Sequence, residues 1–260
     1  MTFFAVGYSL PELNQFFISF DLYIHGSWDG NFNGFSQNDK PDKWIMEFKP
    51  DMELFKDPSA DALSLGKLQY DNNAFGGTTN IVIDNSKNQV VKEYLSLVGT
   101  MTNCAGGVSP MDTWLTCEEN ISKKRKNKIS HGYVFEVKPT VKRGLQKAIP
   151  IKPMGRFSHE AVAFDPATGD AFLTEDRSDS LFYRFISNQT GDLSSGKLFA
   201  LSIEGHPQDT RNWENAFYLK GVKYNVRWVP LNDTNPKDDS LRKKGAGKGA
   251  SFFARGEGVS

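Results

Sequence analysis

The sequence predicts an all-β fold, and three observations favour this class. Aromatic residues and glycine are abundant, with 20 Phe, 8 Tyr, 5 Trp and 23 Gly among 260 residues. Aromatic side chains favour half-buried strands, and glycine favours tight turns. From Gly76 onward, short apolar runs alternate with polar turns, and no stretch keeps a helical periodicity or alternates strands with helices. A sandwich, a barrel or a propeller is therefore expected.

The apolar runs predict a series of strands, several of them joined as hairpins. Two runs flank the polar turn DNSKNQ, two more flank PATG, and another two flank SNQTGD. An apolar run, a polar turn and a second apolar run are typical of a hairpin. The expected strands are residues 79–84, 90–97, 113–119, 132–137, 161–165, 170–176, 180–186, 196–203 and 223–231.

The remaining segments of the chain are predicted to be less regular. Residues 1–60 form an irregular N-terminal segment, and residues 61–260 hold the β domain. One short helix is expected within residues 51–64. The basic stretch KKRKNK (123–128) has the composition of a nuclear-localisation or nucleic-acid patch, but a solvated loop between strands is the favoured interpretation. Residues 232–250 have the composition of a long flexible loop.

Charge and cysteine content exclude several classes of function. Lys and Arg together number 31, as do Asp and Glu, so the formal net charge is zero. A neutral chain has no general attraction for nucleic acid or for an anionic membrane. No run approaches the roughly 20 apolar residues of a membrane span. The chain has only two cysteines, Cys104 and Cys117, and four scattered histidines, which disfavours a disulfide scaffold and a histidine zinc centre. We expect the two cysteines to be free thiols.

The segment NCAGG carries the first candidate for chemistry. Cys104 is followed closely by Gly106 and Gly107, which permit the backbone to bend near the thiol. A thiolate is a soft ligand that suits iron or another transition metal better than calcium. The alternative is that Cys104 is a small buried hydrophobic residue, the usual fate of a free cysteine.

Glutamates supply the other candidate ligands. Glu118 and Glu119 end one expected strand, and alternation along a strand places their side chains on opposite faces. Only one of the two is therefore expected to share a site with Cys104. Glu160 stands where another apolar strand begins, and the neighbouring His159 is expected to be a hydrogen-bonding partner and not a ligand.

Two glycine-containing segments complete the set of candidates. In RGEG, Arg255 and Glu257 are two residues apart, so in a strand they would share one face. Such an arginine can bind phosphate with two hydrogen bonds while the carboxylate holds a metal; a surface ion pair is the alternative. The segment FGGTTN (75–80) is expected to be a plain β-turn in preference to an anion-binding nest.

Taken together, these motifs resemble those of the PhoX alkaline phosphatases. The segments NCAGG, TWLTCEEN, HGYVFEV, MGRFSHEAVAFDP, FLTED, FYRF and FARGEG occur in the order seen in that family, from about Leu68 to Gly258. The resemblance implies a six-bladed β-propeller, a cluster of iron and calcium in its central channel, and hydrolysis of phosphomonoesters. It also implies a phosphomonoester substrate. From the neutral charge and the lack of a long apolar run we expect no nucleic-acid partner and no membrane span, and we expect a monomer.

The resemblance assigns roles to particular residues. Cys104 is similar to the iron-bridging thiolate of the family. Glu119, Glu160 and Glu257 are similar to its metal-binding carboxylates, with Glu118 as the substitute for Glu119. Arg255 is similar to its phosphate-binding arginine. Cys104 and Arg255 are the residues expected to take part in catalysis.

The sequence departs from the family pattern at both ends. The Asn-His-Glu segment that family members carry ahead of the GGTT region is absent, and the chain ends two residues after Gly258. An incomplete propeller is therefore expected. The alternative function is a catalytically inactive, truncated propeller that binds a ligand or a partner. The compartment stays open, because family members are often exported but the N-terminus lacks the basic region of a signal peptide.

Overall fold

The computed structural model describes residues 6–10, 15–22, 67–74, 76–84, 86–87, 89–121 and 129–259. The described strands are β1 (Val6–Leu10), β2 (Gln15–Leu22), β3 (Gly76–Asp84), β4 (Gln89–Thr100), β5 (Asn103–Val108), β6 (Trp114–Glu118), β7 (Val134–Val137), β8 (His159–Phe164), β9 (Ala171–Glu175), β10 (Tyr183–Gln189), β11 (Asp192–Ile203) and β12 (Val226–Leu231). The described helices are the 3₁₀ turn η1 (Lys152–Met154) and the α-helix α4 (Leu241–Gly247).

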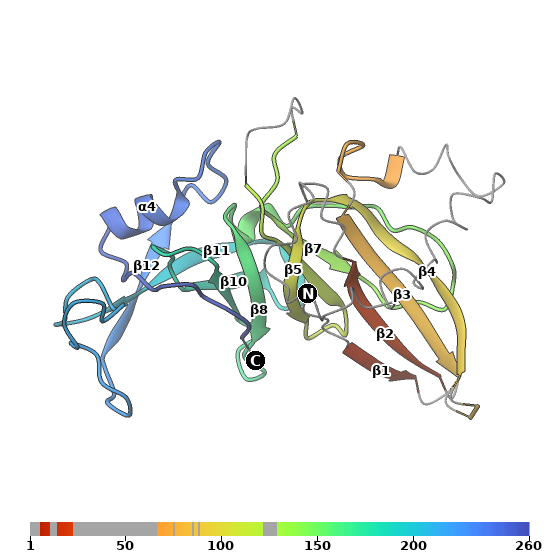
Figure 1. Cartoon of the computed structure of the whole chain (residues 1–260), viewed down its shortest axis with the longest axis horizontal. Coiled ribbons are helices and arrows are strands. Elements are labelled where there is room, and N and C mark those ends of the chain that lie inside the picture. The colour runs from red at the N-terminus through yellow and green to blue at the C-terminus, as the bar shows by residue number, and fades with distance from the viewer. Residues whose placement is uncertain are drawn as a thin grey trace, which may run out of the picture.

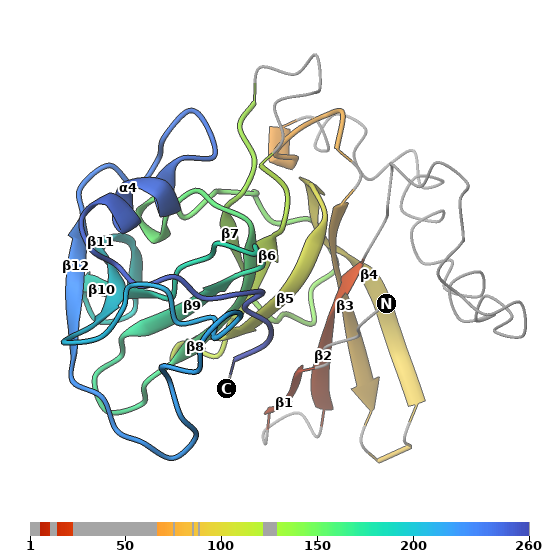
Figure 2. The ribbon, with the colours of Figure 1, turned by 60° about the vertical axis from the view of Figure 1, so that its left-hand side comes forward.

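The strands form three antiparallel sheets that lie side by side (Figure 1). The first sheet has the order β1-β2-β3-β4, the second β5-β6-β7, and the third β12-β11-β10-β9-β8. Strand β5 of the second sheet lies beside β8 of the third in two views (Figure 1, Figure 2). The approach is close enough that a Cβ atom on Gly107 would lie 1.8 Å from the carbonyl oxygen of Val162. Glycine is therefore required where these two sheets meet.

The all-β prediction is confirmed, and the predicted hairpins are present. Strand β3 pairs with β4, β8 with β9, and β10 with β11, each in antiparallel register. The runs at 113–119 and 132–137 also become paired strands, β6 and β7. The run at 223–231 contributes β12, which pairs with β11. The six-bladed propeller stays a prediction.

The prediction of a plain turn at 75–80 is wrong, because residues 76–80 begin strand β3. The glycines there serve close strand packing. A Cβ atom on Gly76 would lie 2.6 Å from the carbonyl oxygen of Thr100, and one on Gly77 would lie 2.2 Å from that of Leu97. Both distances are far below van der Waals contact, so only glycine lets β3 approach β4 here.

The prediction of a flexible loop over 232–250 is wrong in part, because helix α4 spans Leu241–Gly247. Leu241 is buried in the main hydrophobic core, and Gly245 lies against Leu181. These two residues are four apart, the spacing that places them on one helix face. The polar composition of the tract concealed this short apolar face.

Two further differences concern the N-terminal half. Within the irregular segment 1–60, residues Val6–Leu10 pair with Gln15–Leu22, and Gln15–Leu22 pair with β3. Strand β5 was not expected around Cys104. The short helix expected within 51–64 and the basic stretch 123–128 lie outside the described residues.

The largest hydrophobic core holds the third sheet against η1 and α4. Its members are buried apolar side chains contributed by all of these elements, including Met154, Phe157, Leu173, Tyr183 and Leu241. Burial of each such side chain stabilises the fold by about 1.5–3 kcal/mol. The core therefore gives β8 and β9 a rigid base, and the candidate site lies at one end of these strands.

Candidate metal centre

One cluster of potential metal ligands stands out among the described residues. Ligand atoms of Cys104, Glu119 and Glu160 all lie within 4.8 Å of one another. Cys104 comes from β5, Glu119 follows the last residue of β6, and Glu160 is the second residue of β8. The Cys104 thiol donates a hydrogen bond to Glu160 at 3.1 Å. The structure thus brings together three sequence-predicted site residues that lie up to 56 positions apart.

Two β-bulges orient this cluster. Between β5 and β6, the register moves from Asn103 opposite Glu118 to Gly106 opposite Thr116, so three steps on β5 match two on β6. The same irregularity occurs in β8, where the register moves from His159 to Val162. A bulge adds one residue to a strand and redirects the local side chains. Cys104 and Glu160 each lie within such a bulge.

Backbone hydrogen bonds connect the segments that carry the cluster. The amide of Glu119 donates to the carbonyl of Thr102 at 2.9 Å. The hydroxyl of Ser158 donates to the carbonyl of Glu119 at 3.0 Å, and the carbonyl of Ser158 accepts from the amide of Asp176 at 3.2 Å. The ends of β6, β8 and β9 are therefore held at fixed positions around the site.

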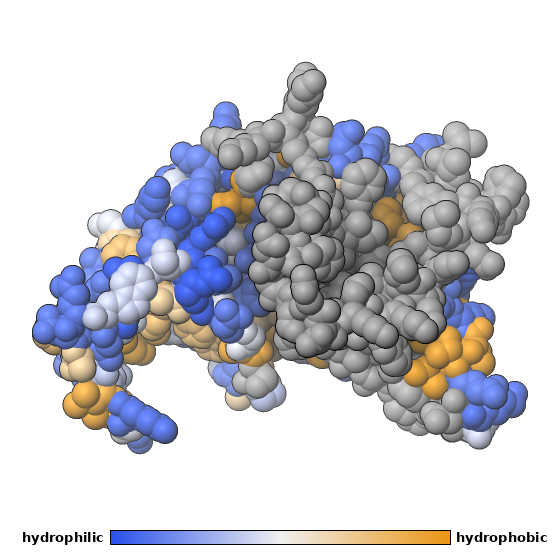
Figure 3. Space-filling view, viewed as in Figure 1, coloured by the Kyte–Doolittle hydropathy of each residue, from blue (hydrophilic) through white to orange (hydrophobic). Residues whose placement is uncertain are grey.

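The C-terminal segment ends beside β8 (Figure 1), on a largely hydrophilic part of that face of the molecule (Figure 3). The amides of Arg255 and Gly256 donate to the carbonyls of Arg177 and Glu175 at 2.8 and 3.1 Å. The carbonyl of Glu257 accepts from the Thr174 hydroxyl at 2.7 Å. The segment is therefore bound to the residues that end β9.

The expectation that Arg255 and Glu257 share one face of a strand is wrong. Arg255 has a φ angle of +52°, in the left-handed region that non-glycine residues rarely adopt, and residues 255–257 are not in a strand. Glu257 has an exposed side chain whose negative charge helps to raise the pKa of Glu160. Backbone strain of this kind is often found at functional sites.

Asp176 is a member of the site that the sequence analysis missed. Its Oδ1 atom forms an ion pair with Nε of Arg255 at 2.9 Å. Asp176 also helps to raise the pKa of Glu119, a member of the cluster. Asp176 therefore connects the predicted arginine to the cluster. Its position directly after β9, in the segment FLTED, was the available signal.

The site gathers negative charge without enough cations to balance it. Burial, and then the charges of Glu119, Glu257 and Asp176, raise the pKa of Glu160 to about 7 against the hydrogen bond from Cys104. Burial and the neighbouring Glu160 raise the pKa of the Cys104 thiol. Burial and Asp176 likewise raise the pKa of Glu119, although Arg177 and Arg255 oppose this. A bound cation would favour the ionised form of all three ligands.

Glu118 lies outside the cluster and is fully buried. Its Oε1 atom accepts hydrogen bonds from the Met101 amide at 2.9 Å and from Nδ1 of His131 at 2.7 Å. Its Oε2 atom accepts from the amides of Gly132 and Tyr133 at 2.7 and 3.2 Å. All of its acceptor capacity is therefore used by three backbone amides and the His131 ring, which leaves Glu119 as the candidate ligand of the pair.

His131 links Glu118 to a second buried carboxylate. Its Nε2 atom lies 3.1 Å from Oδ2 of Asp71, and the ring of Tyr70 packs edge-on against the imidazole. Burial lowers the pKa of His131, but the hydrogen bonds and charges of Glu118 and Asp71 outweigh burial and raise it. A charged His131 donates to both carboxylates.

The raised pKa of His131 predicts a pH dependence of stability. Its contribution is complete below the unfolded pKa of about 6.5 and is lost as the pH rises through the higher folded pKa. The free energy of unfolding should therefore fall across that window by up to about 1.4 kcal/mol per pH unit. Denaturant titration from pH 5 to pH 9 measures this slope, and His131→Gln should flatten it. An unchanged slope in the variant would contradict the assignment.

His159 and Cys117 are both buried and lie outside the metal-ligand cluster. His159 is buried, stacks on Phe157 at a centroid distance of 3.5 Å, and bonds the Gly155 carbonyl through Nε2. Burial lowers its pKa to about 3. Cys117 is buried in the main core, and both cysteines are free.

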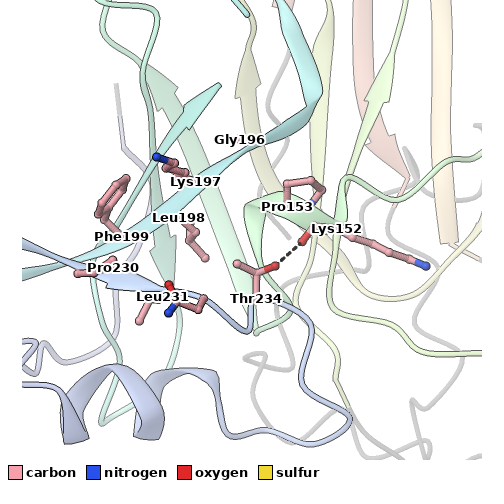
Figure 4. Close-up of a pocket in the computed structure, with 10 residues that line it drawn as sticks. Lys152, Pro153, Gly196, Lys197, Leu198, Phe199, Pro230, Leu231 and Thr234 are labelled. Carbon is pink, nitrogen blue, oxygen red and sulfur yellow. Dashed lines mark hydrogen bonds between the residues drawn. The ribbon is translucent and has the colours of Figure 1, made fainter. Parts of the chain in front are cut away.

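A separate groove of about 610 Å³ lies between η1 and strands β11 and β12 (Figure 4). Its lining residues are Lys152, Pro153, Gly196, Lys197, Leu198, Phe199, Pro230, Leu231, Asn232 and Thr234. None of these side chains is a carboxylate, a thiol or an imidazole. In Figure 4 the Lys152 side chain points away from Thr234, whose hydroxyl donates to the Lys152 carbonyl at 3.4 Å. The groove therefore lacks the ligand set of the cluster.

Comparison with known proteins gives one match. The family model described as alkaline phosphatase PhoX matches residues 69–260. A search of curated proteins and a search of solved structures each found no match. No helix within the described residues is long and apolar enough to cross a membrane.

Proposed function

The chain belongs to the PhoX alkaline phosphatase family, and from this premise we propose that it hydrolyses phosphomonoesters at a metal centre. The observation that carries the proposal is the convergence of Cys104, Glu119 and Glu160, whose ligand atoms lie within 4.8 Å of one another. These residues belong to motifs that lie inside the matched range.

The donor set fits the metals that the motif resemblance implies. A thiolate from Cys104 suits iron, and carboxylates from Glu119 and Glu160 suit both iron and calcium. The raised pKa values of these ligands support a cation at this place, because their negative charges are poorly compensated without one. Bound metals would polarise the phosphoryl oxygens and supply a nucleophilic oxygen at neutral pH.

Arg255 has the position and the chemistry of a phosphate-binding residue. Its Nε atom pairs with Asp176, and its side chain is 64% exposed. The ion pair fixes the guanidinium and leaves its Nη donors free to bind two phosphate oxygens. Fixed donors stabilise charge that develops on those oxygens in the transition state.

The remaining carboxylates take distinct roles. Glu119 is the ligand and Glu118 is not, because four hydrogen bonds already occupy the Glu118 carboxylate. Glu257 contributes a further ligand from the C-terminal segment, which its effect on the pKa of Glu160 supports. The three sheets are blades of a propeller, an arrangement consistent with their antiparallel order.

Metal analysis combined with an activity assay tests the proposal. The purified protein is expected to contain iron and calcium and to release phosphate from p-nitrophenyl phosphate, and a chelator should remove both properties together. The Cys104→Ala variant should lose iron first, because alanine offers no soft ligand. A protein that contains neither metal and has no activity after metal addition would favour an inactive binding module instead.

A further inference from the structure

Arg177 is a charged residue near the cluster for which the proposed function has no role. It follows Asp176 directly, and its amide donates to the carbonyl of Glu175 at 3.1 Å. Its Nε atom is buried and has no hydrogen-bond partner in the described part of the chain. A buried guanidinium nitrogen without a partner is costly, so a bound group that accepts its hydrogen bond would stabilise it.

The backbone places Arg177 next to Arg255. The amide of Arg255 donates to the carbonyl of Arg177 at 2.8 Å, and the amide of Gly256 donates to Glu175 at 3.1 Å. Asp176, which directly precedes Arg177, pairs with Nε of Arg255. Two guanidinium groups therefore start from adjoining backbone positions at one edge of the metal cluster.

The positive charge of Arg177 acts on Glu119, a member of the cluster. Together with Arg255, it opposes the rise in the pKa of Glu119. Yet Arg177 forms no ion pair with a carboxylate among the residues that the structure describes. Its hydrogen-bond donors are thus available to an anion, whereas those of Arg255 are partly engaged by Asp176.

We propose that Arg177 is a second phosphate-binding residue, which contacts the phosphoryl oxygens of the substrate alongside Arg255. The inference rests on the proposed function and assigns a residue that the sequence motifs did not single out. A phosphomonoester carries three terminal oxygens and about two negative charges. A neutral chain offers no general attraction to such a dianion, so local cations must bind it.

Inhibition by inorganic phosphate isolates this binding step. In the metal-loaded protein, Arg177→Gln should raise the inhibition constant of phosphate and the KM for p-nitrophenyl phosphate by about 10- to 100-fold, as expected for loss of a hydrogen bond from a charged group. Iron and calcium content should stay at the wild-type level. The matched control is Arg143→Gln, an exposed arginine in the connection between β7 and η1, which should change neither constant.

A second variant, Arg177→Lys, tests the inference if Arg177→Gln does not fold. Arg177→Lys keeps the positive charge near Glu119 but loses the planar fork, so it should raise both constants by a smaller factor with full metal content. Unchanged inhibition by phosphate in a folded variant would overturn the inference, as would a rise that appears only together with loss of metal. If the wild-type protein binds no metal and hydrolyses nothing, the proposed function itself fails, which is a different result.

Discussion

Glu118→Gln should lower the free energy of unfolding by about 3–5 kcal/mol, the cost of breaking a buried ion pair by removing one partner. Each carboxylate oxygen of Glu118 accepts two hydrogen bonds, from three backbone amides and from His131. A glutamine amide group at either oxygen position would direct its N–H donors at two other donors. The imidazolium of His131 would also keep only Asp71 as a charged partner.

Glu119→Gln provides the matched control, one residue further along the chain. Glu119 is half-buried, and burial and Asp176 disfavour its ionised form, so a neutral side chain should leave the unfolding free energy equal or higher. The same change removes a hard anionic ligand and should abolish most metal binding and phosphatase activity. Chemical denaturation of both variants, with metal analysis of each, makes the comparison.

Two results would contradict the roles assigned to Glu118 and Glu119. If Glu119→Gln destabilised the fold as strongly as Glu118→Gln, or if Glu118→Gln lost its metals while keeping its stability, the roles of the two glutamates would be reversed. Because the two substitutions are chemically identical and adjacent, a general effect of replacing glutamate with glutamine cannot produce the difference.

Local patterns were sufficient to predict most strands but not their assembly. Hairpins such as β8–β9 follow from two apolar runs and a polar turn, which are neighbours in sequence. The bulges at Cys104 and Glu160 depend on register between strands, and no single run carries that information. Helix α4 was missed because its only buried residues without a polar side chain are Leu241 and Gly245, within a polar tract.

The sequence predicted which residue types form the candidate site, but it did not predict how their side chains are arranged. Alternation along β6 separated Glu118 from Glu119, but it did not reveal which of them shares the cluster with Cys104. That choice depends on the buried partner His131, which lies 13 residues away from Glu118. Asp176 and Arg177 escaped notice because no glycine-rich motif surrounds them, and their contacts with Arg255 come from a segment about 80 residues later.

The second large effect concerns Arg255. Arg255→Lys should lower phosphomonoesterase activity by about 30- to 1,000-fold, equivalent to about 2–4 kcal/mol of transition-state stabilisation, while metal content changes little. Arginine can pair with Asp176 through Nε and still present its Nη donors to phosphate. A lysine ammonium has one nitrogen for both partners, so it cannot reproduce this division of hydrogen bonds.

Glu257→Gln should have the reverse effect of Arg255→Lys. Metal content should fall, and phosphate binding should show no separate change. The side chain is exposed and the backbone carbonyl would keep its hydrogen bond from Thr174, so the fold should be unaffected. Loss of one negative charge removes a contribution that raises the pKa of Glu160, so Glu160 should ionise at lower pH in the metal-free variant. Metal titration, an aryl phosphate assay and denaturation of both variants separate the two roles. Near-full activity in Arg255→Lys, or metal loss as complete as in Glu257→Gln, would show that Arg255 acts on the cluster and not on phosphate.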